Sequence, residues 1–265
     1  MAAEKCVSVE FREVGKTYES ISGKVEAVDE VSLSVQGGEF VSIIGPSGCG
    51  KSTLLLMAAG LIKASRGKIF VDGNPVEKPV RNVGFVFQDH LLLEWRTVKK
   101  NLLLPVEMGK NTKISDERID KLIQMVGLSG FENRYPMELS GGMQQRVALC
   151  RALITDPNLL LMDEPLGALD ALTRQQVRYE LEKLWLERTC TTLFVTHDIE
   201  ESILLADRVV VMSERPSKVM EVVNIDLPRP RVFSKGIEAE FDKYKIHIRN
   251  IFERIGVLGS EAHAR

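Results

Sequence analysis

The sequence predicts an α/β protein with a mixed sheet at its core, an antiparallel β lobe near its start and an inserted helical subdomain. Three observations indicate this fold. Short apolar, β-branched runs dominate the first 90 residues. The stretch from Thr97 to Arg134 instead carries apolar residues in a helical pattern. After Ser140 strand-like and helix-like segments alternate, as a parallel sheet requires.

Composition indicates an ordinary globular protein. The 265 residues include 35 Lys and Arg against 37 Asp and Glu, which gives a formal net charge of −2. This balance disfavours binding to the phosphate backbone of a nucleic acid, so no nucleic-acid partner is expected. With 44% hydrophobic and 27% charged residues, the chain is neither disordered nor fibrous and can bury one large core or two lobes.

The cysteines and the start of the chain suggest a compartment. Four widely separated cysteines, at 6, 49, 150 and 190, form no disulfide framework and no zinc pattern, which favours a reducing cytosol. Residues 1–5 lack the apolar core of a signal peptide, and no apolar run approaches the roughly 18 residues that a membrane span needs. Any role at a membrane is therefore expected to require a partner.

The first lobe is expected to be rich in strands. Before the first glycine-rich segment, strands are predicted at 7–14, 31–35 and 39–44. A helix then opens near Thr53, and further strands are predicted at 67–71 and 83–87. The helical insertion follows, with a Leu- and Val-rich segment at 97–108 and a helix at 116–126 that Ser115 can cap.

The second half alternates between the two kinds of element. We expect helices from Ser140 to about Leu153, at 172–187 and at 200–206, and strands at 159–162 and 192–195. A hairpin is predicted at 208–212 and 218–223, and the prolines at 228 and 230 break the chain. An amphipathic helix follows, and packing on its own domain is expected before a separate binding role. The predicted domains are 1–235, with a helical subdomain at about 89–157, and a C-terminal helix and tail at 236–265.

The segment from Gly45 to Ser52 fits the pattern G-x-x-x-x-G-K-[ST] between a predicted strand and a predicted helix. Glycines let backbone N–H groups turn inward, Lys51 reaches the outer phosphates, and the Ser52 hydroxyl can bind magnesium. A glycine turn without ligand is the structural alternative. The pattern predicts a site for a nucleoside triphosphate and Mg²⁺, with the nucleotide contacted by Gly45, Pro46, Ser47, Gly48, Cys49, Gly50, Lys51, Ser52 and Thr53.

Cys49 lies inside this loop, close to the predicted start of a helix. The partial positive charge of a helix N-terminus lowers the pKa of a nearby thiol, so a lowered pKa is one expectation for Cys49. The alternative is that Cys49 is only a tolerated small residue.

Acidic and basic groups are predicted at the ends of two neighbouring buried strands. Asp163 and Glu164 follow one apolar strand, and His197 follows the next. Asp163 is expected to hold the magnesium shell through water, and Glu164 to act as general base on the attacking water. His197 can hydrogen-bond the γ-phosphate and that water. The alternatives are a solvated turn for the acids and a capping role for the histidine.

The motifs stand in the order found in ATP-binding subunits of ABC transporters, which this chain resembles over roughly residues 7–223. The matching segments are Gly45–Ser52, Gln88, Leu139–Gly142, Leu161–Glu164, Ala168–Asp170 and His197. The resemblance implies an ABC-type P-loop NTPase fold. It also implies that Gln88 links magnesium and the attacking water to the transport channel, with Lys51, Glu164 and His197 as further catalytic residues and Ser52, Gln88 and Asp163 at the metal.

The same resemblance implies a site shared by two chains. Ser140, Gly141 and Gly142 would clamp the γ-phosphate bound by the opposite subunit, and Asp170 would lie in the loop that connects the two sites. Exposed backbone N–H groups at a helix start support this assignment, although Ser-Gly-Gly alone is usually a turn. The two copies are then expected to pair head to tail in an ATP-dependent dimer. Tyr18 matches the aromatic position that stacks on adenine; the alternative is a core residue at a strand end.

Further segments resemble importers of the nitrate, sulfonate and taurine group. They are Gln88–Val98, Pro165–Asp170, Arg215-Pro216 and Asp226–Pro230, although Glu94 stands where the group usually has proline. This implies integral-membrane permease subunits, an extracytoplasmic solute-binding protein that acts indirectly, and a peripheral location on the cytoplasmic face of the membrane. Residues 91–95 either pack in the core or form a groove for a permease helix.

Three functions remain open at this point. The first is import of a small organic or inorganic anion, with vitamin precursors as cargo of sister systems. The second is an exporter or lipid-transport ATPase, which shares the catalytic motifs. The third is a non-transport ABC ATPase, although the chain has neither the long coiled-coil insertion nor the paired cassettes of such proteins.

Overall fold

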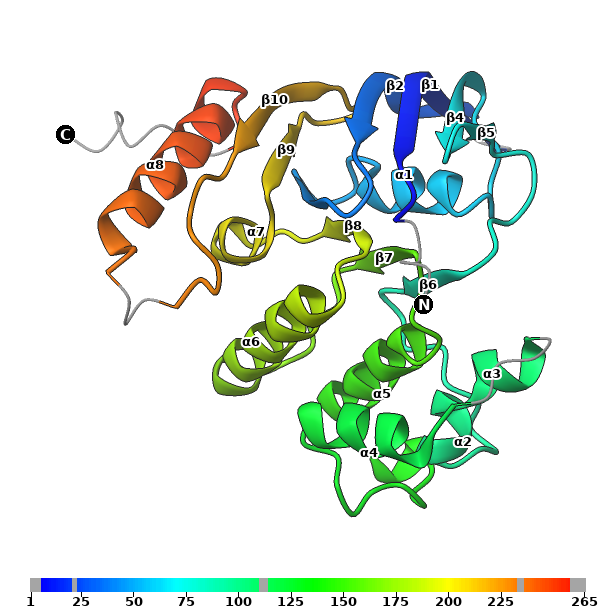
Figure 1. Cartoon of the computed structure of the whole chain (residues 1–265). Helices are drawn as coiled ribbons and strands as arrows, with labels where there is room; N and C mark the ends of the chain where they lie inside the picture. Colours follow the sequence, from blue (N-terminus) through cyan, green and yellow to red (C-terminus); the bar gives the residue numbers. More distant parts are fainter. Residues whose placement is uncertain (1–5, 21–22, 110–113, 233–235, 258–265) are drawn as a thin grey trace.

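The computed structural model describes residues 6–20, 23–109, 114–232 and 236–257, and shows two sheets, a helical subdomain and a C-terminal helix (Figure 1). The expectation that residues 1–5 form no signal peptide, and the tail beyond residue 257, lie outside the described residues. Within the described ranges, no helix has the length and apolar composition needed to cross a membrane.

The first sheet is an antiparallel lobe of four strands in the order β2-β1-β4-β5. Its strands are β1 (Val9–Ser20), β2 (Gly23–Val35), β4 (Arg66–Val71) and β5 (Asn74–Pro75). The predicted strands at 7–14 and 31–35 are the inner parts of β1 and β2. The outer part of the β1–β2 ribbon, which pairs Tyr18 with Val25, was missed because its residues are mostly polar and exposed and lack the apolar alternation of a half-buried strand.

The second sheet is mixed, as predicted. Its six strands run in the order β10-β9-β3-β8-β7-β6, and only the edge strand β10 (Val219–Asn224) pairs antiparallel, with β9 (Arg208–Met212). The other strands are parallel: β3 (Phe40–Ile44), β8 (Thr191–Val195), β7 (Leu159–Asp163) and β6 (Val83–Val86). Every residue of β3, β7 and β8 is buried, which explains their continuous apolar runs.

The helical subdomain follows β6, on the side of the sheet away from the α8 end in Figure 1. It contains α2 (Val98–Leu102), α3 (Leu104–Met108), α4 (Asp116–Met125), a short 3₁₀ turn (Pro136–Glu138) and α5 (Gly141–Leu153). Thr97, Ser115 and Ser140 cap α2, α4 and α5 through their hydroxyls. The segment predicted as helical at 97–108 divides into two helices at Leu103, just before Pro105, which has no N–H to donate.

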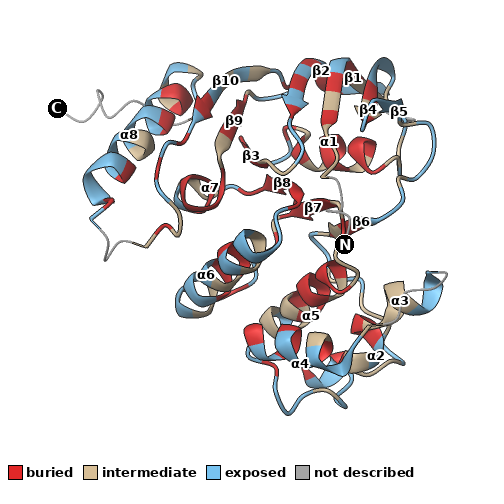
Figure 2. Cartoon of the chain, in the orientation of Figure 1, coloured by how far each residue is buried: buried red, intermediate tan, exposed pale blue. Residues whose placement is uncertain are grey.

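The remaining helices are α1 (Lys51–Ala58), α6 (Ala171–Glu187), α7 (Ile199–Leu205) and α8 (Glu238–Arg254). The buried face of α8 carries Phe241, Ile248, Ile251 and Phe252, which join the same apolar cluster as residues of α7 (Figure 2). The expectation that the last helix packs on its own chain is therefore confirmed.

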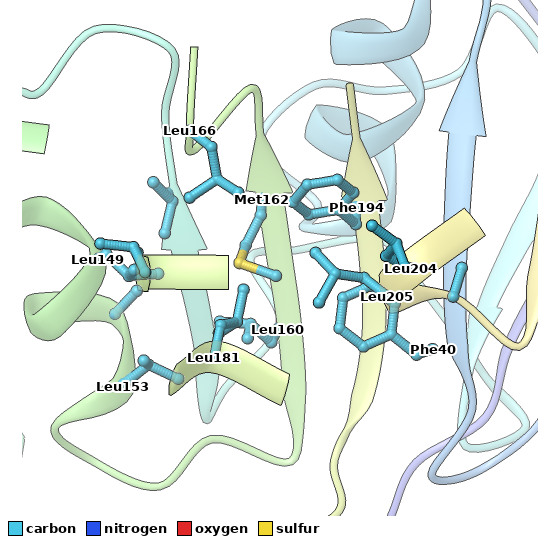
Figure 3. Packing of buried hydrophobic residues seen from close by; sticks show 14 of the residues in the cluster. Phe40, Leu149, Leu153, Leu160, Met162, Leu166, Leu181, Phe194, Leu204 and Leu205 are labelled. Carbon is cyan, nitrogen blue, oxygen red and sulfur yellow. The ribbon is translucent and has the colours of Figure 1, made fainter. Parts of the chain in front are cut away.

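One apolar cluster connects the sheet to α5, α6 and α7. At its centre, Phe194 of β8 lies beside Phe40 of β3, with ring centroids 5.8 Å apart (Figure 3). Met162 of β7 packs in the same layer, close to the ends of the strands. This layer supports the loops that follow β3, β7 and β8.

We predict that Phe194→Ala lowers the free energy of unfolding by about 3–5 kcal/mol, because the ring is fully buried and its removal leaves a cavity. Urea unfolding followed by circular dichroism measures the change. Met137→Ala is the control, since Met137 is 82% exposed and its loss should cost less than about 0.5 kcal/mol. Equal stability of the two variants would contradict the assignment of this layer as the core.

Candidate active site

The glycine-rich loop leaves β3 after Ile44 and enters α1 at Lys51. Gly48 and Gly50 have φ angles of 73° and 114°, which favour glycine, and a Cβ on Gly50 would lie 2.8 Å from the Ala27 carbonyl oxygen. Gly50 is the N-cap of α1 and supplies no side chain to bond the first N–H groups of the helix. Those N–H groups and the helix dipole therefore form an anion-binding surface.

The Lys51 side chain folds back across this loop. Its Nζ atom donates hydrogen bonds to the carbonyl oxygens of Gly45 and Pro46, both at 2.8 Å. The side chain is buried, so its charge is stabilised by these carbonyls and by any anion that binds the loop. The ammonium group is thus held at the centre of the predicted phosphate site.

Cys49 does not have the lowered pKa that its position in the sequence suggested. Its side chain is buried, and burial raises the pKa of the thiol, while the positive charge of Lys51 lowers it by a smaller amount. Removal from water disfavours the thiolate more than the nearby charge and the helix start favour it. The expectation of a lowered pKa is wrong, and Cys49 is a buried structural thiol.

Asp163 is the last residue of β7 and lies against the start of α1. Burial raises the pKa of its carboxyl group, the charge of Glu164 raises it further, and a hydrogen bond from Ser52 opposes both. One carboxylate oxygen, Oδ1, is buried without a hydrogen-bond partner among the described residues. A hard cation such as Mg²⁺ prefers such oxygen donors, so the carboxylate and hydroxyl present here fit the predicted metal.

Glu164 and His197 meet at the same edge of the sheet. His197 Nδ1 lies 3.3 Å from Glu164 Oε2, within hydrogen-bonding distance. The backbone of Glu164 has a φ of 47°, which is uncommon for a residue other than glycine, and its N–H donates to the Val195 carbonyl at 2.9 Å. A strained residue held by two neighbouring strands is a feature of functional sites.

A cavity of about 420 Å³ lies between the phosphate loop and the pair Glu164 and His197. Its walls are Ser47, Gly48, Gly50, Lys51, Ser52, Thr53, Gln88, Glu164 and His197. The strands β3, β6, β7 and β8 are parallel, so the loops that follow them open on one side of the sheet. The structure therefore brings together the predicted phosphate, water and histidine groups of one chain.

Tyr18 lies near the mouth of this cavity. The residue is 40% exposed, its hydroxyl lies 3.3 Å from the Thr53 hydroxyl, and Lys16 Nζ is 5.1 Å from the ring centre. The alternative that Tyr18 is a core residue at a strand end is wrong. An exposed ring beside Thr53 can stack on a flat base.

The second glycine-rich segment is separate from this cavity. Ser140 caps α5 by accepting a hydrogen bond from the Met143 N–H at 3.3 Å, and Ser140 and Gly141 are exposed. Asp170 likewise caps α6 through the Thr173 N–H at 3.0 Å. Among the described residues that line the cavity, none comes from 140–142 and none is Asp170. The starts of α1 and α5 are therefore two separate helix N-termini, and only the first lines this cavity.

Sequence reasoning missed Arg215 as a neighbour of the phosphate loop. One of its guanidinium nitrogens lies 3.4 Å from the point that a Cβ on Gly48 would occupy, and its charge lowers the pKa of Cys49. In the sequence, Arg215 belongs to a predicted hairpin turn and to an importer-like segment, and it lies more than 160 residues from the loop. No local pattern could have placed it there.

Comparison with known proteins identifies related sequences. The family model described as ABC transporter matches residues 28–167. An aliphatic sulfonates import ATP-binding protein of Bacillus cereus is 42% identical over 252 residues, which are 95% of this chain and 98% of the relative. A nitrate import ATP-binding protein of Synechococcus elongatus is 43% identical and matches 82% of this chain and 81% of its own length.

Solved structures of ABC transporter cassettes are also similar to this chain. The dimeric structure of a bacterial ABC transporter cassette superposes with a TM-score of 0.75 at 33% identity, and covers 83% of this chain and all of the other chain. A dimeric post-hydrolysis state of that cassette, bound to ADP and phosphate, superposes with the same TM-score, identity and coverage. The predicted ABC-type fold is confirmed.

We predict that iodoacetamide labels Cys6 faster than Cys49 in the folded chain. Cys6 is partly exposed, whereas Cys49 is buried and its raised pKa reduces the thiolate fraction at any pH below it. Peptide mass spectrometry after timed alkylation measures both rates, and the Cys49 rate should still rise as the pH increases above 9. Labelling of Cys49 as fast as that of Cys6 at neutral pH would contradict this description.

Proposed function

Since this chain belongs to the ABC transporter family, we propose that it hydrolyses ATP to drive import of a small solute through a separate membrane permease. Relatives named for import of aliphatic sulfonates and nitrate support an importer. The observation that carries the proposal is the cavity between the phosphate loop and the pair Glu164 and His197. We propose that residues 1–235 form the ATPase domain, with a helical subdomain at about 89–157, followed by a C-terminal helix and tail at 236–265.

The residues around the cavity have complementary roles in this proposal. The loop N–H groups and Lys51 bind the β- and γ-phosphates, and Tyr18 stacks on the adenine ring. Glu164 accepts the proton of the attacking water, and His197 holds that water and the γ-phosphate in position. The products are ADP and phosphate, and the proton of the water passes to the carboxylate.

A divalent cation completes the site. We assign its binding to Ser52, Gln88 and Asp163, because the Ser52 hydroxyl and the unpartnered Asp163 oxygen are the donors that Mg²⁺ prefers. When bound, the ion neutralises phosphate charge during the reaction. Asp163 then stays ionised despite its burial, since a nearby cation favours the carboxylate. Gln88 lies in the cavity wall, at the start of the loop that leads to the helical subdomain.

The segment Ser140–Gly142 is assigned to a second phosphate contact, which it makes with the nucleotide bound by a partner copy. Ser140, Gly141 and Gly142 expose backbone N–H groups at the start of α5 but do not line their own cavity. In a two-fold dimer each copy can present this surface to the γ-phosphate bound by the other. Asp170, beside it at the start of α6, then lies between the two sites. ATP joins the two chains, and its hydrolysis weakens the contact.

The loop that follows Gln88 is assigned as the docking site for the membrane permease. Leu91 is exposed there and Trp95 is 75% exposed, so this segment is available to a permease helix and the alternative of core packing does not hold for these two residues. In this proposal the chain is peripheral on the cytoplasmic face of the membrane. An extracytoplasmic solute-binding protein delivers nitrate, a sulfonate, taurine or a similar anion. Glu94 stands where this group usually has proline, so the loop does not assign one of these anions, and the cargo is selected by the permease and the solute-binding protein.

We predict that Glu164→Gln forms a stable dimer in the presence of ATP and magnesium, because ATP joins the two chains and is no longer hydrolysed. Gel filtration with light scattering measures the mass with and without nucleotide. The double variant Glu164→Gln/Lys51→Ala is the control and should remain monomeric, since it cannot hold the phosphates. A Glu164→Gln chain that stays monomeric at saturating ATP and magnesium would contradict the dimer.

We predict that Trp95→Ala reduces the amount of membrane permease that co-purifies with this chain, while ATP hydrolysis by the isolated chain is unchanged. Trp95 is mostly exposed and lies outside the cavity, so its removal should affect only the partner. Met220→Ala, which removes an exposed apolar side chain on β10, is the matched control. Full retention of the permease by Trp95→Ala would remove the support for this docking surface.

A further inference from the structure

A proline- and arginine-containing segment, Pro228–Arg231, follows β10 and leads toward α8. Figure 1 shows it descending from β10 along α7 before the chain reaches α8. The segment is not part of the cavity, and the proposed function gives it no role. Its two arginines nevertheless donate hydrogen bonds to carbonyl oxygens at the C-terminal end of α7.

Arg231 is the most buried charged residue of the segment, with only 2% of its surface exposed. Its Nη1 group donates to the carbonyl oxygens of Ile203 at 2.6 Å and Ala206 at 2.5 Å, at the C-terminal end of α7. Its other donors bond the carbonyls of Leu227 and Ile225. The last carbonyls of a helix have no partner within the helix, so Arg231 supplies hydrogen bonds that α7 cannot make itself.

The positive charge of Arg231 is favourable at the C-terminal end of α7. The C-terminal end of a helix carries partial negative charge, which stabilises a cation. Burial and the neighbouring Arg229 lower the pKa of Arg231 to about 10, so it remains protonated at neutral pH. The cation is therefore held mainly by backbone carbonyls, and its removal would leave several of them without a partner.

Contacts of Arg229 and Glu182 connect the same segment to α6. Arg229 donates to the Leu205 carbonyl at 2.6 Å and to Asp207 at 2.8 Å, and its guanidinium stacks over Trp185. Glu182 of α6 accepts the backbone N–H of Arg231 at 3.1 Å. The C-terminal end of α7 is thus fixed to α6 through this segment.

The other end of α7 begins beside the cavity. Asp198 caps the helix by accepting the N–H groups of Glu200 and Glu201, and His197 immediately precedes it. The His197 side chain is 59% exposed, so packing of its own ring does little to hold it near Glu164. A seven-residue helix is only about 10 Å long, so a shift at its C-terminal end moves its first residue.

We propose that Arg231 is a positioning residue for His197, acting through α7 from the side opposite the nucleotide. This inference rests on the proposed function, in which His197 holds the γ-phosphate and the attacking water. Without Arg231, the carbonyls of Ile203 and Ala206 lose their shared donor, the C-terminal end of α7 shifts against α6, and His197 loses its alignment with Glu164. Binding of ATP by the loop between β3 and α1 is unaffected, because Arg231 does not contact that loop.

The test is a double-mutant cycle on ATP hydrolysis by the full chain, with Arg231→Met, His197→Gln and the two combined. Arg231→Met should lower kcat about tenfold or more and leave the KM for ATP within about twofold, because the loss is one of alignment. In the His197→Gln background, Arg231→Met should then cause no further loss. Arg254→Met, an exposed arginine of α8 that bonds Glu221, is the control and should keep full activity.

Losses that multiply in the double variant would overturn the inference, since they would show that Arg231 acts independently of His197. So would a raised KM with unchanged kcat. If Arg231→Met does not fold, Arg231→Lys keeps the cation with fewer donors and enters the same cycle, with a smaller loss of kcat expected. Full activity of His197→Gln would instead overturn the proposed role of His197, which separates the two failures.

Discussion

The parallel pairing of four strands is the constraint on which the site depends. β3, β8, β7 and β6 run in the same direction, and their register pairs Ile43 and Asp163 with Val195, and Val86 with Met162. The phosphate loop, Gln88, Glu164 and His197 therefore follow strand ends that lie at one edge of the sheet. A shift of one residue in any strand would turn its side chains to the opposite face and separate these groups.

Several groups at this edge are less stable in the free chain than they would be with a ligand. Asp163 has a buried oxygen without a partner, Glu164 adopts a strained backbone, and the first N–H groups of α1 receive no side-chain cap. A buried oxygen without a partner and a strained backbone are both costly, and in the proposed function a bound cation and phosphate give partners to the Asp163 oxygen and to the N–H groups of α1. The apolar layer around Phe40 and Phe194 supplies the stability that maintains this arrangement.

Much of the fold and site could be predicted because the signals were local. The buried strands are continuous apolar runs in the sequence, the helix after Ser115 begins at a capping residue, and the phosphate loop has a fixed spacing. Properties that depend on tertiary packing could not be predicted. Burial raises the pKa of Cys49, and Arg215 reaches the loop from a distant hairpin. Arg231 donates hydrogen bonds to carbonyls at the C-terminal end of α7 that lie 25 residues or more before it in the chain.

The central claim is that each nucleotide is held by the phosphate loop of one copy and by Ser140–Gly142 of the other. Mixing an inactive Lys51→Ala chain with an inactive Ser140→Arg chain tests it directly. The mixed dimer has one site in which both surfaces are intact, so mixing should restore ATP hydrolysis. If native mass spectrometry detects the mixed dimer but activity remains absent, the two surfaces act within one chain and the account is wrong.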